Sequence, residues 1–128
     1  MHLVGIDIID IHRISLTIER WGERFLQRIY TPRELLYCHG RVPQLASRFA
    51  AKEAFAKALG TGIGRVVGFQ GLTVRNNENG KPHFIPSEKL RQYLIEKSIK
   101  QAHLSISDES QNAIAFVVLE TFDVLTQD

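Results

Sequence analysis

Two isolated carboxylates, each on an apolar stretch of the chain, are the residues best suited to chemistry. Glu53 lies in S-R-F-A-A-K-E-A-F-A-K-A-L-G-T-G, a pattern that predicts a helix, and Lys57 follows one turn later. Asp7 closes the N-terminal G-I-D, where strand periodicity turns it toward apolar side chains. Two semi-buried acids repel each other unless a cation or proton lies between them. Magnesium with a polyphosphate meets this need, because it takes one or two carboxylates and completes its shell with water and phosphate oxygens. The pair therefore indicates an enzyme with a metal-phosphate site.

Each acid also has a purely structural interpretation. Glu53 and Lys57, four residues apart with the acid first, form a helix-stabilising pair worth a few tenths of a kcal/mol. A strand acid such as Asp7 can accept backbone hydrogen bonds at a sheet end or face solvent at an edge. Taken one at a time, these interpretations are favoured, and only the two acids together point to a metal.

The elements that must position these acids follow from patterning and capping signals. Residues 3–11 are apolar and β-branched enough for a buried strand, and Asp10 is placed to cap a following helix. Thr31, Pro32 and Glu34 match a capping box with proline at the first helical position, which predicts a short helix.

A longer helix is predicted from Pro43 to about Leu59, and Gly60 suits its left-handed termination. This helix carries Glu53. Lys52 falls in the middle of its apolar stripe, where packing would prefer no charge. The stripe consists of Leu45, Phe49, Ala56 and Leu59.

The second half of the chain predicts a hairpin, a helix capped by Ser87 and two final strands. Their ranges are 66–75 and 82–85 for the hairpin strands around a turn at 76–80, 87 to about 99 for the helix, and 103–107 and 113–120 for the last strands. The tail after Thr121 is expected to fray. The fold class is therefore α+β, a single domain over residues 1–128 with a largely antiparallel sheet packed against helices.

Composition limits the compartment and the partners. The chain has 128 residues, 44% of them hydrophobic, which suits one compact core. Cys38 is the single cysteine, so an internal disulfide is excluded, and no Cys/His spacing resembles a zinc site. No apolar run approaches the roughly 20 residues that span a bilayer, and the N-terminus lacks the features of a signal peptide. We expect a cytoplasmic protein with no membrane partner.

The motifs of the two acids are similar to those of a known family. G-I-D-I-I-D-I-H-R-I at 5–14 and F-A-A-K-E-A-F-A-K-A at 49–58 resemble the signature segments of the holo-acyl-carrier-protein synthases, which are phosphopantetheinyl transferases. The resemblance continues through G-K-P at 80–82 and H-L-S-I-S at 103–107. It implies transfer of 4′-phosphopantetheine from coenzyme A to a serine of apo acyl carrier protein. Adenosine 3′,5′-bisphosphate would leave, and the activity would serve fatty acid biosynthesis.

The resemblance also assigns roles to residues of the predicted site. Asp7 and Glu53 match the family's two magnesium-binding acids, and Glu53 would also help to take the proton from the incoming serine. Lys57 matches a position that faces the phosphates of coenzyme A. Arg48 would contact the terminal 3′-phosphate. Ordinary surface charge is the alternative for Lys57 and Arg48.

Further residues of this resemblance would line the nucleotide. Gly60 and Gly62 would let the backbone approach it closely, although G-x-G also serves as a helix exit. Lys81 and Pro82 would form part of its wall. His103 resembles a family histidine near the pyrophosphate, and a structural hydrogen bond is an equal alternative.

Asp108 departs from the family pattern. A second histidine is frequent in the family five residues after the first, and this chain has Asp108 there instead. The exchange removes one contact to phosphate or to a moving proton. It also adds a negative charge that disfavours an anionic ligand if the side chain points inward. Phe49, where tryptophan is frequent, is a milder packing change.

A basic region near the front of the chain predicts an acidic partner. The formal net charge is only +2, yet residues 11–48 carry seven arginines against three glutamates. Because carrier proteins are acidic, the resemblance implies that Arg13, Arg20 and Arg24 steer the carrier. Arg20, Arg24 and Arg28 would align if one helix persisted through Gly22. A solvated helix face is the alternative.

Assembly and rival functions complete the predictions. Short-chain members of the family form trimers with active sites between subunits, which implies a homotrimer here. A nucleic-acid-binding module is disfavoured, because the chain lacks an aromatic strand platform and a basic excess across the domain. A noncatalytic coenzyme A or nucleotide-binding protein is the second rival, and tight binding without transfer would select it.

Overall fold

The computed structural model describes residues 1–122, and the predicted frayed tail after Thr121 falls almost entirely outside them. The elements in chain order are β1 (His2–Asp10), α1 (Ile11–Trp21), α2 (Glu23–Ile29), α3 (Pro32–Cys38), α4 (Val42–Leu59), a 3-10 turn at Phe69–Gly71, β2 (Leu72–Asn76), β3 (Pro82–Pro86), α5 (Glu88–Glu96), β4 (Ile99–Asp108) and β5 (Asn112–Thr121). No helix within residues 1–122 is both long and apolar enough to cross a membrane.

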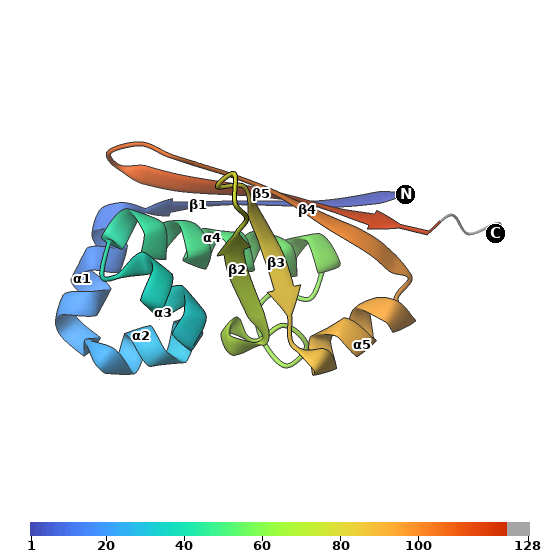
Figure 1. The fold of residues 1–128 in the computed structure, drawn as a ribbon, viewed down its shortest axis with the longest axis horizontal. Coiled ribbons are helices and arrows are strands. Elements are labelled where there is room, and N and C mark those ends of the chain that lie inside the picture. Colours follow the sequence, from blue (N-terminus) through green and yellow to red (C-terminus); the bar gives the residue numbers. More distant parts are fainter. Residues whose placement is uncertain (123–128) are drawn as a thin grey trace.

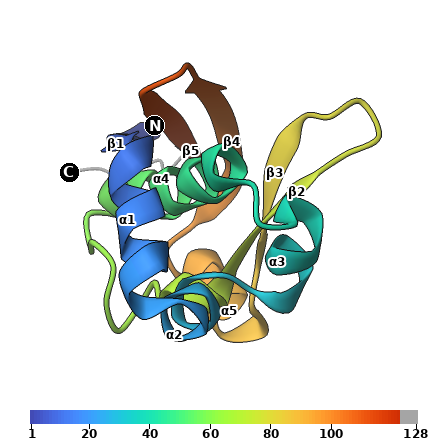
Figure 2. The ribbon, with the colours of Figure 1, turned by 90° about the vertical axis from the view of Figure 1, so that its left-hand side faces the viewer.

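The three long strands form an antiparallel sheet in the order β1-β5-β4, and β2 with β3 forms a separate antiparallel hairpin. Helix α4 lies against the sheet (Figure 1), and the hairpin lies beside this helix with β3 next to β4. Helices α1 to α3 gather at one end of the molecule and α5 at the other, and the hairpin turn projects away from the body (Figure 2). The predicted α+β class with a largely antiparallel sheet is confirmed.

Helix α4 is buried around most of its circumference, far beyond the predicted single stripe. Alanines at positions 50, 51, 54, 56 and 58 are buried together with Phe55. Small side chains let neighbouring elements approach the helix closely. Strand β1 uses this at Gly5, where an added Cβ would lie 2.0 Å from the carbonyl oxygen of Ala54. The fold therefore holds β1 and α4 at a short, fixed separation.

The capping predictions are confirmed by hydrogen bonds. Asp10 accepts from the backbone of His12 at 2.8 Å, and Thr31 and Glu34 form the reciprocal capping box. Gly60 ends α4 with φ +82°, in the left-handed region. Ser87 caps α5.

Two predicted boundaries are wrong, and the condition that would align Arg20, Arg24 and Arg28 on one helix is not met. No helix persists through Gly22, because its φ of +55° breaks the path between α1 and α2. The strand predicted at 66–75 begins only at Leu72, since a bridge and a 3-10 turn precede it. Helix α5 ends at Glu96, and Ile99 already belongs to β4.

Lys52 is a buried charge with a complete set of partners. Its side chain is fully buried, and Nζ lies 2.6 Å from Glu34 Oε1 and 2.8 Å from the carbonyl oxygens of both Ile29 and Phe69. Burial lowers the pKa of Lys52, and the Glu34 carboxylate opposes that shift. The other Glu34 oxygen accepts from the backbone of Val74 at 2.7 Å. This pair joins α3 and α4 to the start of the hairpin.

Candidate active site

Asp7 and Lys57 form an ion pair between β1 and α4. Asp7 lies on the inner face of the sheet with 15% of its side chain exposed, and its register partner is the buried Ala115. Lys57 Nζ donates to Asp7 Oδ1 at 2.9 Å and to the carbonyl oxygen of Ile6 at 3.2 Å. About half of the Lys57 side chain stays exposed. Its ammonium is therefore fixed beside Asp7 and still open to a ligand.

Glu53 shares a pocket with Asp7. This pocket has a volume of about 270 Å³, and its lining includes Arg13, Thr17, Phe25 and Phe49. Burial raises the pKa of Glu53, the charge of Asp7 raises it further, and Lys57 opposes both effects. Among residues 1–122, Lys57 makes no ion pair with Glu53, so the alternative of a helix-stabilising pair is not what the structure contains.

The donor set of this pocket fits magnesium. Two carboxylates offer hard oxygen ligands, and a cation between them would offset both the burial and the Asp7 charge that raise the pKa of Glu53. In the described part of the chain, no cluster of three or more histidine, cysteine, aspartate or glutamate side chains could hold a metal alone. A cation here needs further oxygen ligands, which water and phosphate can supply.

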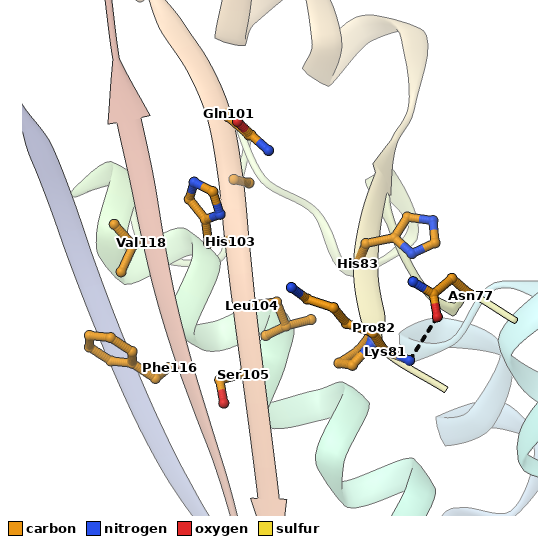
Figure 3. Close-up of a pocket in the computed structure, with 11 residues that line it drawn as sticks. Asn77, Lys81, Pro82, His83, Gln101, His103, Leu104, Ser105, Phe116 and Val118 are labelled. Atoms are coloured by element: carbon orange, nitrogen blue, oxygen red, sulfur yellow. Dashed lines mark hydrogen bonds between the residues drawn. The ribbon is translucent and has the colours of Figure 1, made fainter. Parts of the chain in front are cut away.

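Lys81, Pro82 and His103 lie together in a different pocket, of about 480 Å³, between the hairpin and β4 (Figure 3). Lys81 and Pro82 come from the hairpin, while His103 projects beside Val118 along the sheet. His103 Nε2 lies 3.2 Å from Glu120 Oε1, so the structural hydrogen bond is present. This pocket opens on the outer face of the sheet, opposite to Asp7. Within a single chain, Lys81, Pro82 and His103 therefore do not share a pocket with Asp7 and Glu53.

Arg48 lies in a third pocket, of about 200 Å³, which Asn76, Pro82 and Asp108 also line. Only 4% of Arg48 is exposed, and its guanidinium carbon lies 4.4 Å from the centre of the Tyr37 ring. Arg48 is thus a buried cation at the wall of a pocket. The alternative interpretation of Arg48 as an ordinary surface charge is wrong.

Gly60 and Gly62 act as a helix exit. The amides of Gly60, Thr61 and Gly62 donate to the carbonyl oxygens of Lys57 and Ala56 at 3.0 to 3.2 Å. Their φ angles are +82° and +66° at the two glycines, which favours glycine at both. These N–H groups already have partners within the chain, so close approach to a nucleotide would use the open space around the glycines.

Arg20 and Arg24 remain neighbours although α1 ends between them. Their guanidinium carbons lie 5.2 Å and 5.9 Å from the ring centre of Trp21, which is 49% exposed. Trp21, Arg24 and Arg28 also line a groove with Thr17 and Phe25. The sequence interpretation missed Trp21, an exposed aromatic flanked by arginines, which is a typical composition for a docking surface.

The outer face of the sheet is unusually apolar. Val4, Ile6 and Ile8 of β1 are 58 to 61% exposed, and Phe116 of β5 is 43% exposed. Ile6 and Phe116 pair directly across the two strands. The signal in the sequence was a strand with apolar residues at nearly every position, which indicates burial on both faces.

Comparisons with known proteins agree on one family. Residues 3–117 match the sequence model described as 4′-phosphopantetheinyl transferase superfamily. The holo-acyl-carrier-protein synthase of Ruthia magnifica is 56% identical over 94% of this chain and 97% of its own. That of Halothermothrix orenii is 48% identical over 91% of this chain and 95% of its own.

Solved structures extend the similarity to the fold. The synthase of Neisseria meningitidis superposes with a TM-score of 0.89 at 43% identity, over 93% of this chain and 98% of its own. The Helicobacter pylori synthase in complex with coenzyme A has a TM-score of 0.86 at 33% identity, over 92% and 100% of the two chains.

Proposed function

The chain belongs to the 4′-phosphopantetheinyl transferase superfamily, among its holo-acyl-carrier-protein synthases, and we propose that Asp7, Glu53 and Lys57 form its reaction centre. It transfers 4′-phosphopantetheine from coenzyme A to a serine of apo acyl carrier protein. The observation that supports this centre is a single pocket holding both acids, with Lys57 bound to one of them. We further propose fatty acid biosynthesis in the cytoplasm as its setting.

In the reaction, the serine hydroxyl oxygen forms a bond to the phosphorus that carries pantetheine, and the bond from that phosphorus to the leaving adenosine 3′,5′-bisphosphate breaks. Asp7 and Glu53 would hold magnesium, which supplies positive charge to the pyrophosphate when bound. Lys57 donates to the phosphate oxygens from its exposed side and stabilises charge on the leaving group. Glu53, directly or through a metal-bound water, accepts the serine proton.

The arginines around Trp21 provide a surface for the carrier protein. Arg13 lines the pocket of the two acids, and Arg20 and Arg24 lie over Trp21 at the end of α1. An acidic carrier attracted to these guanidinium groups would present its serine at the pocket, while Trp21 offers an aromatic contact. Charge complementarity supports this orientation of the two proteins.

We also propose a homotrimer, in which the apolar outer face of the sheet is covered by neighbouring copies. Exposed patches of this kind mark interfaces in soluble proteins. The pocket of Lys81, Pro82 and His103 opens on the same face, so association can bring it to the Asp7 and Glu53 of the next copy. Such an arrangement would explain why Lys81, Pro82 and His103 lie in a different pocket from Asp7 and Glu53 within one chain. Phe116→Lys should then give monomers in sedimentation velocity, and unchanged sedimentation would refute the interface.

The central experiment mixes the protein with coenzyme A, magnesium and an apo carrier protein, and measures the intact mass of the carrier. Added phosphopantetheine supports the function, and its absence refutes it. Asp7→Ala and Glu53→Ala should each abolish transfer, while Glu96→Ala on the exposed surface of α5 serves as the matched control. Near-normal turnover in either site variant would reject the assigned metal ligands.

A noncatalytic coenzyme-binding protein is the second candidate, and Asp108 in the Arg48 pocket is the observation that favours it. Such a protein would bind coenzyme A and leave the carrier mass unchanged. The same experiment therefore separates the two functions.

A further inference from the structure

Arg48 brings an unpaired positive charge to its pocket among residues 1–122. Arg48 donates through Nη2 to the side-chain oxygen of Asn76 and through Nη1 to the carbonyl oxygen of Gln44 at 3.5 Å. Its Nε is buried and has no hydrogen-bond partner among residues 1–122. Both acceptors are neutral and no ion pair involves Arg48 within the described residues, so its positive charge attracts an anionic oxygen that enters the pocket.

Asp108 faces the same pocket from the end of β4. Its Oδ2 lies 3.4 Å from the hydroxyl of Ser47, which also lies 2.9 Å from the carbonyl oxygen of Pro43. Because a hydroxyl has a single hydrogen, the shorter contact takes it, and Asp108 gains little from Ser47. No ion pair joins Asp108 to Arg48 within the described residues. The carboxylate is thus exposed and uncompensated at the pocket.

The charges decide which ligand group the pocket prefers. Arg48 contributes one positive charge and Asp108 one negative charge, so the two sum to zero. A phosphate monoester carries nearly two negative charges at neutral pH, and it would be attracted by Arg48 and repelled by Asp108. A hydroxyl in the same place would meet no such repulsion.

We infer that Asp108 is a specificity-determining residue, which weakens the preference of this chain for a coenzyme that carries a 3′-phosphate over one that ends in a free 3′-hydroxyl. The inference rests on the proposed function, because it takes Arg48 as the contact to the 3′-phosphate. Dephosphocoenzyme A would then compete with coenzyme A better in this chain than in one without the carboxylate.

Asp108→Asn tests this with little change of shape, since the amide has nearly the size of the carboxylate and only the charge is removed. Isothermal titration measures the affinities for adenosine 3′,5′-bisphosphate and for 5′-AMP, and their ratio reports recognition of the 3′-phosphate. Because Asp108 is exposed, we expect the ratio to rise about three- to tenfold at low salt and the gain to shrink at high salt. Arg48→Met should bring the ratio close to one.

Glu96→Gln removes a negative charge far from the pocket and should leave the ratio unchanged. A ratio in Asp108→Asn within twofold of the original protein overturns the inference, as does a preserved ratio in Arg48→Met. The inference is also overturned if neither the original protein nor Asp108→Asn binds adenosine 3′,5′-bisphosphate. If the original protein transfers phosphopantetheine but Asp108→Asn leaves the affinity ratio unchanged, only the role of Asp108 is refuted. If the original protein shows no transfer, the proposed function itself is refuted.

Discussion

Gly5→Ala should damage both the fold and the site by adding a single methyl group. The new Cβ would lie 2.0 Å from the carbonyl oxygen of Ala54 and 2.7 Å from the backbone nitrogen of Ala58. Both atoms belong to the backbone of α4, so no side-chain rotation relieves the clash. Ordinary contact begins near 3.4 Å, which means that β1 must retreat from α4 by about 1.4 Å.

This retreat reaches the candidate active site, because Asp7 follows Gly5 on the same face of β1. Lys57 holds Asp7 at 2.9 Å and the carbonyl oxygen of Ile6 at 3.2 Å, and both contacts would exceed hydrogen-bonding distance after such a shift. Overpacking of a core costs about 1–3 kcal/mol of unfolding free energy. A misplacement of about 1 Å can cost 100-fold in rate, so we expect transfer to fall roughly 10- to 100-fold in the folded variant.

Urea unfolding measures the stability, and the intact mass of the carrier over time measures transfer. Gly68→Ala is the matched control, because its added Cβ would meet only one atom, at 3.9 Å. The control should stay within about 1 kcal/mol of the original protein. If Gly5→Ala matches the control in both stability and transfer rate, the close packing of β1 on α4 does not position Asp7, and the argument fails.

The remaining predictions address the buried ion pair, the acidity of the site and the carrier surface. Lys52→Met should lower the free energy of unfolding by about 3–5 kcal/mol, because Glu34 then stays buried without its cation. A loss below about 1 kcal/mol in urea unfolding would contradict this. The raised pKa of Glu53 means that the folded chain holds the proton of this carboxyl group more tightly than the unfolded chain does. Protonated Glu53 therefore stabilises the fold at pH values below its ordinary pKa of 4.5, and this contribution is lost as the pH rises through the pKa of the folded state. Glu53→Gln should therefore gain stability relative to the original protein at neutral pH but not at acid pH, and equal differences at both would refute the shift. Replacing Arg20 and Arg24 together by glutamate should raise the KM for the carrier, most strongly at low salt, with coenzyme A affinity unchanged in titration. An equal loss of both would argue against the docking surface.

Local signals in the sequence predicted the caps and most elements. Asp10, Thr31, Gly60 and Ser87 end or begin helices through hydrogen bonds to residues within a few positions, so their roles are visible from sequence neighbours alone. The strand predicted at 66–75 was wrong at its start because its beginning depends on distant contacts and not on sequence neighbours. It contains glycines, and whether they interrupt a strand depends on contacts with distant elements.

The buried pair of Lys52 and Glu34 shows where local interpretation stops. Glu34 was correctly assigned to a capping box, and its Oε1 does accept from the backbone of Thr31 at 2.9 Å. The same oxygen also binds Lys52, which lies 18 residues away in sequence. Nothing at sequence level indicates that one carboxylate serves both contacts, because the second depends on how α3 packs beside α4.

The partner of Lys57 decides between the two sequence interpretations of Glu53. A glutamate four residues before a lysine lies within reach of it on a helix, so Glu53 was available to Lys57 as a partner. Lys57 instead donates to Asp7 Oδ1 at 2.9 Å, 50 residues away in sequence, and to the carbonyl oxygen of Ile6 at 3.2 Å, so strand β1 offers it two acceptors. Lys57 therefore pairs with Asp7, and no ion pair joins Glu53 to a cation within residues 1–122, as the proposed metal-phosphate site requires. The sequence could name these three residues, but only the approach of β1 to α4 at Gly5 determines which two of them meet.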